Sequence, residues 1–263
     1  MSEKDNTVLK VDNLSIAFGG LKAVDNLSFD IKENEIYGLI GPNGAGKTTV
    51  FNCITQFYKP DQGDLKFKGH GDVVTDLTSK PVHEIIKLGL VRTFQNVELI
   101  RELSIMDNVL IGGHLDFTAS TLSQALRLPK ARKEEEKYRK EAEIILDYMG
   151  ILDRKDHLVG GQPYGILKKV EFARTLMARP KLIILDEPAA GLNDQETIDL
   201  AQTIKKIRSE YNCSILLVEH DMRLVMDVCD RICAINFGKL LAIGTPKEIQ
   251  QNAEVQAAYL GVD

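Results

Sequence analysis

Hydrophobic and polar positions alternate along the first 70 residues in the way that half-buried strands require. The alternating runs predict strands at residues 8–11, 14–18, 27–31 and 64–68. The pair Gly19-Gly20 separates the second run from the third and predicts a turn. Residues 35–40 form a mostly apolar run instead, which predicts a strand buried on both faces.

Helical spacing appears after residue 47 and again in the middle of the chain. Apolar side chains recur at the spacing of one helix face at Val50, Phe51, Ile54 and Phe57. Residues 94–173 look helical, and their charged section, residues 130–143, mixes charge signs four residues apart. Such mixing favours a solvated helix face over a basic binding patch.

The last third alternates between short apolar runs and helical patterns. Residues 182–185 and 214–218 predict buried strands, and residues 199–209 and 222–228 predict helices between and after them. Strands that alternate with helices in this way predict an α/β fold with a doubly wound, mostly parallel sheet.

Residues 41–48 match the pattern G-x-x-x-x-G-K-[ST] at every position, directly after a predicted strand and at the start of a predicted helix. Glycines let successive backbone N–H groups point inward as an anion site, and the helix start adds partial positive charge. The lysine can reach the β and γ phosphates of a nucleotide, and the following threonine can bind Mg²⁺. The predicted nucleotide-binding residues are Gly41, Pro42, Asn43, Gly44, Ala45, Gly46, Lys47, Thr48 and Thr49.

Two carboxylates follow the apolar run at residues 182–185. A buried strand that ends in Asp186 places that carboxylate at the carboxyl edge of the sheet, where α/β folds bind ligands. Beside a phosphate loop, Asp186 is a natural Mg²⁺ ligand, and Glu187 could orient and polarise the attacking water. Together with the loop, this pair indicates a nucleotide hydrolase.

With these motifs the chain resembles the ATP-binding cassette (ABC) family over nearly its whole length. The resemblance implies a Q-loop role for Gln95, which would meet Mg²⁺ and water, and a D-loop at residues 188–193. It also implies that His220 contacts the γ-phosphate and that Phe18 stacks on adenine. Phe18 as a core strand residue is the alternative.

The family fold implied is a P-loop NTPase with an ABC-type mixed sheet core and an N-terminal antiparallel β subdomain. Residues 1–263 would be one ABC ATPase domain, with a helical subdomain at about residues 96–173 inserted in the core.

The family's signature motif can be placed in two registers. Residues 158–162 match it by letters, whereas the basic pair and Ala-Arg of the following helix favour residues 162–166. In the second register Gly165 would face the nucleotide of a partner subunit, with Gln162 and Ile166 departing from the usual pattern. Asn193 likewise replaces the usual D-loop aspartate.

Several segments together resemble the ATP-binding subunit of branched-chain amino-acid importers: residues 91–96, 163–174, 186–193, 219–225 and 258–261. This resemblance implies ATP and Mg²⁺ as cofactors and uptake of amino acids as the process. It implies a second ABC ATPase subunit, two transmembrane permeases and an external solute-binding protein as direct or indirect partners. The location implied is the cytoplasmic face of the cell membrane.

The composition excludes some classes of partner but does not identify a function. The 263 residues carry a formal net charge of −5, which argues against nucleic acid as a main partner and against adhesion to anionic lipid. No apolar run approaches the roughly 18 residues that cross a bilayer, and residues 1–11 lack a signal-peptide pattern. We therefore expect a chain that stays inside the cell. The cysteines are scattered, which favours free buried thiols over a metal site: Cys53, Cys213, Cys229 and Cys233.

The sequence alone leaves other functions open. The same core motifs would serve the ATPase of a urea or amide importer or of a lipopolysaccharide-type exporter. A non-transport ABC ATPase and a regulatory, catalytically inactive cassette are further alternatives, although the intact Lys47, Asp186, Glu187 and His220 argue against inactivity.

Overall fold

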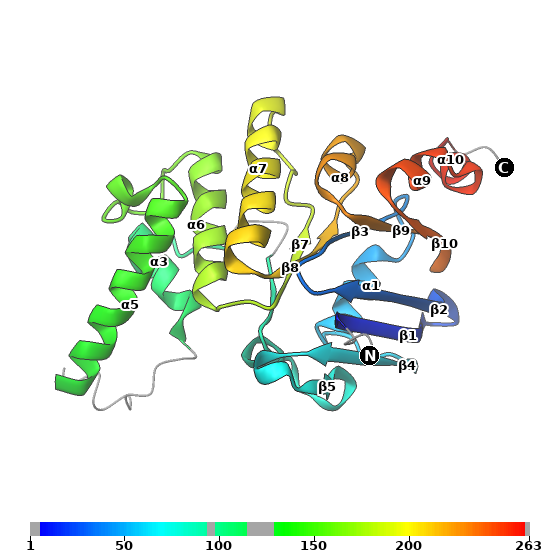
Figure 1. The fold of residues 1–263 in the computed structure, drawn as a ribbon, viewed down its shortest axis with the longest axis horizontal. Coiled ribbons are helices and arrows are strands. Elements are labelled where there is room, and N and C mark those ends of the chain that lie inside the picture. The colour runs from blue at the N-terminus through cyan, green and yellow to red at the C-terminus, as the bar shows by residue number, and fades with distance from the viewer. Residues whose placement is uncertain (1–5, 94–97, 115–128, 261–263) are drawn as a thin grey trace, which may run out of the picture. The chain divides into compact units, whose positions relative to one another are not determined.

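A computed structural model describes residues 6–93, 98–114 and 129–260 (Figure 1). The chain divides into two compact units. The first unit combines Met1–Gln95 with Lys181–Asp263, and the second unit is Asn96–Pro180. Each unit has its own elements and its own packed interior.

A six-stranded sheet forms the centre of the first unit in the described residues, in the order β10-β9-β3-β8-β7-β6 (Figure 1). Neighbouring strands are parallel except β10, which pairs antiparallel with β9. The mixed sheet with a parallel majority confirms the predicted fold class. The strands span Ile36–Ile40 (β3), Leu90–Arg92 (β6), Leu182–Asp186 (β7), Ser214–Val218 (β8), Arg231–Asn236 (β9) and Lys239–Gly244 (β10).

The three central strands β3, β7 and β8 are buried at every residue, because parallel strands are covered on both faces. Their continuous apolar runs are therefore the expected sequence pattern. Helices α7 and α8 pack against each other, and an Asn193–Glu196 capping box begins α7. The helices of this unit span Lys47–Ile54 (α1), Val82–Ile85 (α2), Asp194–Tyr211 (α7), Met222–Val228 (α8), Pro246–Gln251 (α9) and Ala253–Leu260 (α10).

A four-stranded antiparallel sheet completes the first unit in the described residues, in the order β2-β1-β4-β5. The prediction of two separate strands before Gly19-Gly20 was wrong, because β1 is continuous. Asn13 adopts a left-handed φ of 53° where the pairing register with β2 shifts, so the strand passes through a bulge instead of ending. The strands span Thr7–Phe18 (β1), Leu21–Lys32 (β2), Gln62–Lys68 (β4) and Val74–Asp76 (β5).

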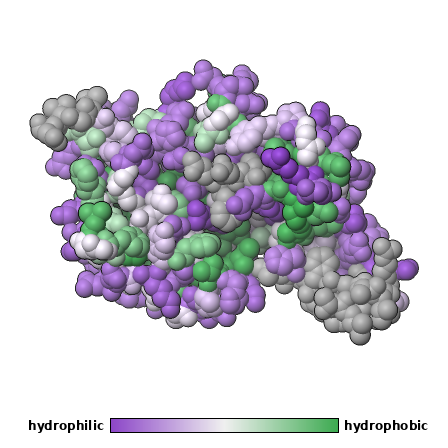
Figure 2. Space-filling view, turned by 180° about the vertical axis from the view of Figure 1, so that it is seen from behind, coloured by the Kyte–Doolittle hydropathy of each residue, from purple (hydrophilic) through white to green (hydrophobic). Residues whose placement is uncertain are grey.

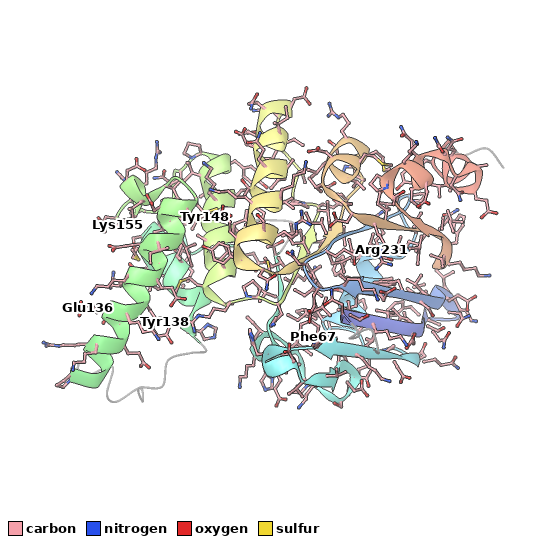
Figure 3. The ribbon with its side chains drawn as sticks, in the orientation of Figure 1. Phe67, Glu136, Tyr138, Tyr148, Lys155 and Arg231 are labelled. Atoms are coloured by element: carbon pink, nitrogen blue, oxygen red, sulfur yellow. The ribbon has the colours of Figure 1, made fainter. Side chains whose placement is uncertain are left out.

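Arg231 links the two sheets of this unit (Figure 3). From β9 its guanidinium donates to the backbone oxygen of Asp30 on β2 at 2.8 Å and pairs with the carboxylate of Glu35. It also lies over the ring of Tyr37, with 5.1 Å from Cζ to the ring centroid. These contacts hold the edge of the antiparallel sheet against the strand that precedes the phosphate loop. The four cysteines are buried free thiols, as predicted.

The second unit is built from helices that pack on one another in its described residues. Predicted charge pairs four residues apart are present on α5, where Lys140 lies 2.8 Å from Glu136 and Arg139 lies 3.2 Å from Glu135 (Figure 3 labels Glu136). These side chains are exposed, whereas Tyr138 on the same helix is buried. The helices span Ile105–Gly112 (α3), Pro129–Tyr148 (α5) and Tyr164–Met177 (α6).

Surface hydropathy is mixed. The face shown in Figure 2 carries many hydrophilic side chains with hydrophobic groups between them. Among the helices that the structure describes, none combines the length and the apolar character that a bilayer crossing requires.

Candidate nucleotide-binding site

The phosphate loop joins the end of β3 to the start of α1. Gly46 at the helix N-cap has a φ of 103°, and no side chain caps the helix there. The first turn of α1 carries no acidic residue, so its backbone N–H groups and the helix dipole favour an anion. Gly41 is needed for packing, because a Cβ at this position would lie 2.3 Å from the carbonyl oxygen of Ile235.

Lys47 begins α1, and its ammonium points back toward the loop. Nζ donates to the carbonyl oxygens of Gly41 at 2.6 Å and Pro42 at 3.1 Å. Burial lowers the pKa of Lys47, while the negative charges of Glu187 and Asp186 act in the opposite direction. A bound phosphate group would add negative charge beside this buried ammonium and stabilise its charged form.

A pocket of about 330 Å³ opens over the loop. Glu187 contributes to its wall from the segment after β7, and Thr48 and Thr49 contribute from the first turn of α1. The residues that line the pocket therefore include loop residues with backbone N–H groups, two lysines, two threonines and one glutamate. Its lining residues are Leu21, Lys22, Ala23, Asn43, Gly44, Ala45, Gly46, Lys47, Thr48, Thr49, Glu187 and Phe237.

Asp186 is the last residue of β7 and is not among the residues that line the pocket. Its Oδ2 pairs with Nη2 of Arg92 at 3.1 Å, and Arg92 also donates to Asn52 at 2.9 Å and lies 4.1 Å above the ring of Phe51. Burial raises the pKa of Asp186, and the Arg92 charge opposes that rise. The carboxylate is thus held in a defined position by an arginine that the sequence patterns did not single out.

Glu187 and His220 come together beside Asp186. The carboxylate of Glu187 lies 3.7 Å from Nδ1 of His220, and the backbone N–H of Glu187 donates to the Val218 carbonyl at 2.8 Å. Glu187 has a left-handed φ of 45°, which is strained for a side chain of its size. The strand-end carboxylates and the histidine after β8 therefore share one edge of the sheet.

Glu219 connects the segment after β7, which carries Glu187, to the segment after β8, which carries His220, through backbone hydrogen bonds. Its carboxylate has no exposed surface and accepts backbone N–H groups from Ala189 at 2.9 Å, His220 at 2.9 Å and Asp221 at 3.2 Å. Sequence reasoning missed this residue. Its signal was an acidic side chain directly after four buried aliphatic residues.

Two predicted site residues in the described ranges, Phe18 and Gly165, are not among the residues that line the pocket. The ring of Phe18 packs edge-on against Tyr58, with the centroids 5.2 Å apart, and Phe18 is not among the residues that line the pocket. Gly165 lies in the first turn of α6 in the second unit, and Pro163 precedes that helix as its N-cap. Gln95 falls outside the described residues.

The C-terminal helix α10 approaches the same loop. Burial raises the pKa of the Tyr259 phenol to about 12, and the backbone N–H of Gly41 has an opposing effect. The last helix and the first residue of the phosphate loop are therefore neighbours.

Comparison with known proteins identifies the class. A family model described as ABC transporter matches residues 24–190, and one described as branched-chain amino acid ATP-binding cassette transporter matches residues 239–263. The structure of an ATP-binding cassette of an ABC transporter in its ADP conformation is similar, with a TM-score of 0.82 and 30% identity. That similarity covers 97% of this chain and 99% of the other. The chain belongs to the ABC transporter family, and it is an ATP-binding cassette with the ATPase activity of that family.

Relatives of nearly equal length carry more particular names. The chain is 42% identical to the high-affinity branched-chain amino acid transport ATP-binding protein LivG of Salmonella typhimurium and to BraF of Pseudomonas aeruginosa. Both alignments span 254 residues, 97% of this chain and 98% of the relative. It is 30% identical over 255 residues to the lipopolysaccharide export system ATP-binding protein LptB of Haemophilus influenzae.

Proposed function

We propose that this chain is the ATP-hydrolysing subunit of an importer for branched-chain amino acids. The observation that carries the proposal is the match of residues 239–263 to the branched-chain model, added to 42% identity along nearly the whole of LivG and BraF. Those residues include α9 and α10, and α10 reaches the phosphate loop at Gly41. The segment that favours this subfamily therefore lies next to the first residue of the phosphate loop.

The loop residues and Lys47 bind the phosphates of ATP, because the pocket presents N–H groups and a buried ammonium at one end. Glu187 orients the attacking water, and His220, 3.7 Å away, contacts the γ-phosphate. Gly165 at the start of α6 serves the nucleotide of a partner cassette, so each ATP is shared by two chains.

The oxygen donors at the site fit Mg²⁺. Thr48 supplies a hydroxyl and Asp186 a carboxylate, and Mg²⁺ in nucleotide sites takes one or two protein oxygens together with phosphates. Gln95 is the third proposed ligand. When bound, the ion neutralises charge on the β and γ phosphates. Asp186 must then exchange at least part of its contact with Arg92 for the metal.

The proposed assembly has two such cassettes, identical or different, on two transmembrane permeases at the cytoplasmic face of the membrane. An external solute-binding protein delivers the amino acid. Binding of ATP closes the two cassettes and hydrolysis reopens them, so a ligand shared between subunits drives the motion.

Uptake measured in cells tests the proposal. A strain lacking this gene should lose uptake of labelled leucine, isoleucine and valine, and the wild-type gene should restore it. Glu187→Gln should restore no uptake, and the purified assembled transporter with this change should bind ATP without turnover. Glu210→Gln is the matched control, because it makes the same chemical change at an exposed position of α7.

Uptake that is unaffected by loss of the gene would refute the importer assignment. Near wild-type hydrolysis by Glu187→Gln in the assembled transporter would refute the role of Glu187. Loss of lipopolysaccharide export with normal amino-acid uptake would favour the exporter alternative that the 30% identity to LptB represents.

A further inference from the structure

Arg92 and the proposed metal ligand Asp186 lie on one face of two neighbouring strands. Arg92 on β6 is paired with Ile184 of the parallel strand β7, two residues before Asp186. Side chains two residues apart on a strand share a face, and so do directly paired residues of neighbouring strands, so Arg92 and Asp186 project from the same face of the sheet. The backbone N–H of Thr93 donates to the carbonyl oxygen of Ile184 at 2.9 Å, which fixes this register at the end of β6.

Arg92 contacts both segments that would supply metal ligands. Its Nη2 pairs with Oδ2 of Asp186 at 3.1 Å, and the two side chains are only 15% and 12% exposed. Its Nη1 donates to Oδ1 of Asn52 at 2.9 Å, and Asn52 lies on α1 one turn after Thr48. One guanidinium therefore joins the strand end that carries the proposed carboxylate ligand to the helix that carries the proposed hydroxyl ligand.

The guanidinium of Arg92 also has contacts that do not depend on Asp186. Its Cζ lies 4.1 Å from the centroid of the buried Phe51 ring and 5.8 Å from the centroid of the Phe57 ring. A guanidinium that lies over an aromatic face and donates to an amide keeps favourable contacts when another partner leaves. Arg92 can therefore release the carboxylate of Asp186 and remain in place.

The charge of Arg92 opposes a second cation at this carboxylate. A divalent cation at either oxygen of Asp186 must displace the guanidinium or lie close to a like charge. Mg²⁺ in nucleotide sites takes one or two protein oxygens and completes its coordination with phosphates and water. The ion alone would therefore gain few ligands for the ion pair that it breaks, whereas the ion together with ATP gains phosphate oxygens as well.

We propose that Arg92 competes with Mg²⁺ for Asp186, so that this carboxylate accepts the ion together with ATP but not alone. Arg92 is thus a positioning residue, and this role rests on the proposed function of Asp186 as a metal ligand. The charge of Asp186 also acts on the ammonium of Lys47 in the phosphate loop, so it is close enough to repel phosphates when Arg92 is removed. Removal of the guanidinium should raise the affinity for Mg²⁺ and lower the affinity for metal-free nucleotide.

Thermal unfolding with Mg²⁺ and no nucleotide is the first test. Millimolar Mg²⁺ should change the melting temperature of the full-length wild type by no more than about 1 °C and should raise that of Arg92→Met by several degrees. Adding Asp186→Asn to Arg92→Met should remove the response. Arg139→Met is the matched control, because it removes the same charge at an exposed position of α5 and should respond as the wild type does.

Equal responses of the wild type and Arg92→Met to Mg²⁺ would overturn the proposal. If Arg92→Met does not fold, Arg92→Gln replaces it, because glutamine removes the charge and keeps a neutral donor at this position.

The affinity for a non-hydrolysable ATP analogue, measured by calorimetry in EDTA and in Mg²⁺, is the second test. The ratio of the two dissociation constants should be about tenfold larger for Arg92→Met than for the wild type, because the metal-free analogue meets an uncompensated carboxylate and Mg²⁺ has no competing guanidinium. A loss of stability alone would weaken both affinities and leave the ratio unchanged. A ratio equal to that of the wild type would overturn the proposal. A wild-type chain that binds the analogue in neither condition would refute the phosphate-loop assignment, and the test without nucleotide would still decide the role of Arg92.

Discussion

Replacing Glu219 by glutamine exchanges one carboxylate oxygen for an amide nitrogen with almost no change in side-chain size. In the structure, Oε1 accepts one backbone N–H, from Ala189, and Oε2 accepts two, from His220 and Asp221. The amide of glutamine has a single acceptor oxygen. Its NH₂ group must therefore face at least one backbone N–H donor that the carboxylate now satisfies.

The expected change in the free energy of unfolding follows from these contacts. A hydrogen bond to a charged group contributes about 1.5–3 kcal/mol, and an unsatisfied buried donor costs about 1–3 kcal/mol. The neutral amide is easier to bury than a carboxylate, which offsets part of this loss. Because Glu219 has no exposed surface, solvent cannot replace the missing contact. We expect Glu219→Gln to lower the free energy of unfolding by about 2–4 kcal/mol.

Urea unfolding followed by circular dichroism measures this difference, with the slope m compared between variants. Glu210→Gln is the control, because Glu210 is exposed near the end of α7 and its substitution should stay within about 0.5 kcal/mol. If Glu219→Gln changes the unfolding free energy no more than this control does, the three backbone contacts do not hold the segments of Glu187 and His220 in place. Such a result would refute the reasoning.

Three further changes test neighbouring parts of the site. Burial lowers the pKa of Lys47, so the unfolded chain binds more protons than the folded chain as pH rises toward 10.5. The free energy of unfolding, measured with urea, should therefore increase with pH in this range. Lys47→Met should lack this increase. Gly41→Ala should destabilise the chain by about 1–3 kcal/mol in thermal unfolding, because its Cβ would meet the carbonyl oxygen of Ile235; an unchanged melting temperature would contradict this. Arg92→Met should cost about 3 kcal/mol in urea unfolding by leaving the Asp186 carboxylate buried without its partner, and adding Asp186→Asn should recover part of the loss.

Local patterns were enough to predict the phosphate end of the site. The strand, the loop and the helix that make it are contiguous in the chain, and the apolar run of β7 ends at the residue that reaches the sheet edge. Helix α8 has the bounds that its spacing predicted, Met222–Val228. In each case the sequence pattern and the element that it predicts lie in the same short segment.

Contacts between distant segments were not predictable in this way. Arg92 and Asp186 are 94 residues apart in the chain, and their pairing depends on β6 and β7 lying side by side. No strand is predicted at β10, although residues 240–243 form a short apolar run; the structure places this strand at the edge of the sheet, where it is only partly buried. Without that strand no hairpin is expected, and the position of Phe237 beside the loop cannot be inferred from the sequence.

Backbone strain is present at the same pocket as well as elsewhere in the chain. Most of the non-glycine residues with positive φ in the described ranges are asparagine or aspartate, which tolerate this region; the exceptions are Gln56, Arg179, Glu187 and Phe237. Two of these four, Glu187 and Phe237, line the pocket, although they lie 50 residues apart in the chain. Both residues therefore have a backbone conformation that their side chains disfavour. Such strain is expected at a binding site, where the position of the side chain matters more than the local backbone energy. Glu187 directs a carboxylate into the pocket that holds the loop, and Phe237 adds an apolar ring to it. The strain at Glu187 and Phe237 is consistent with a binding role for this pocket.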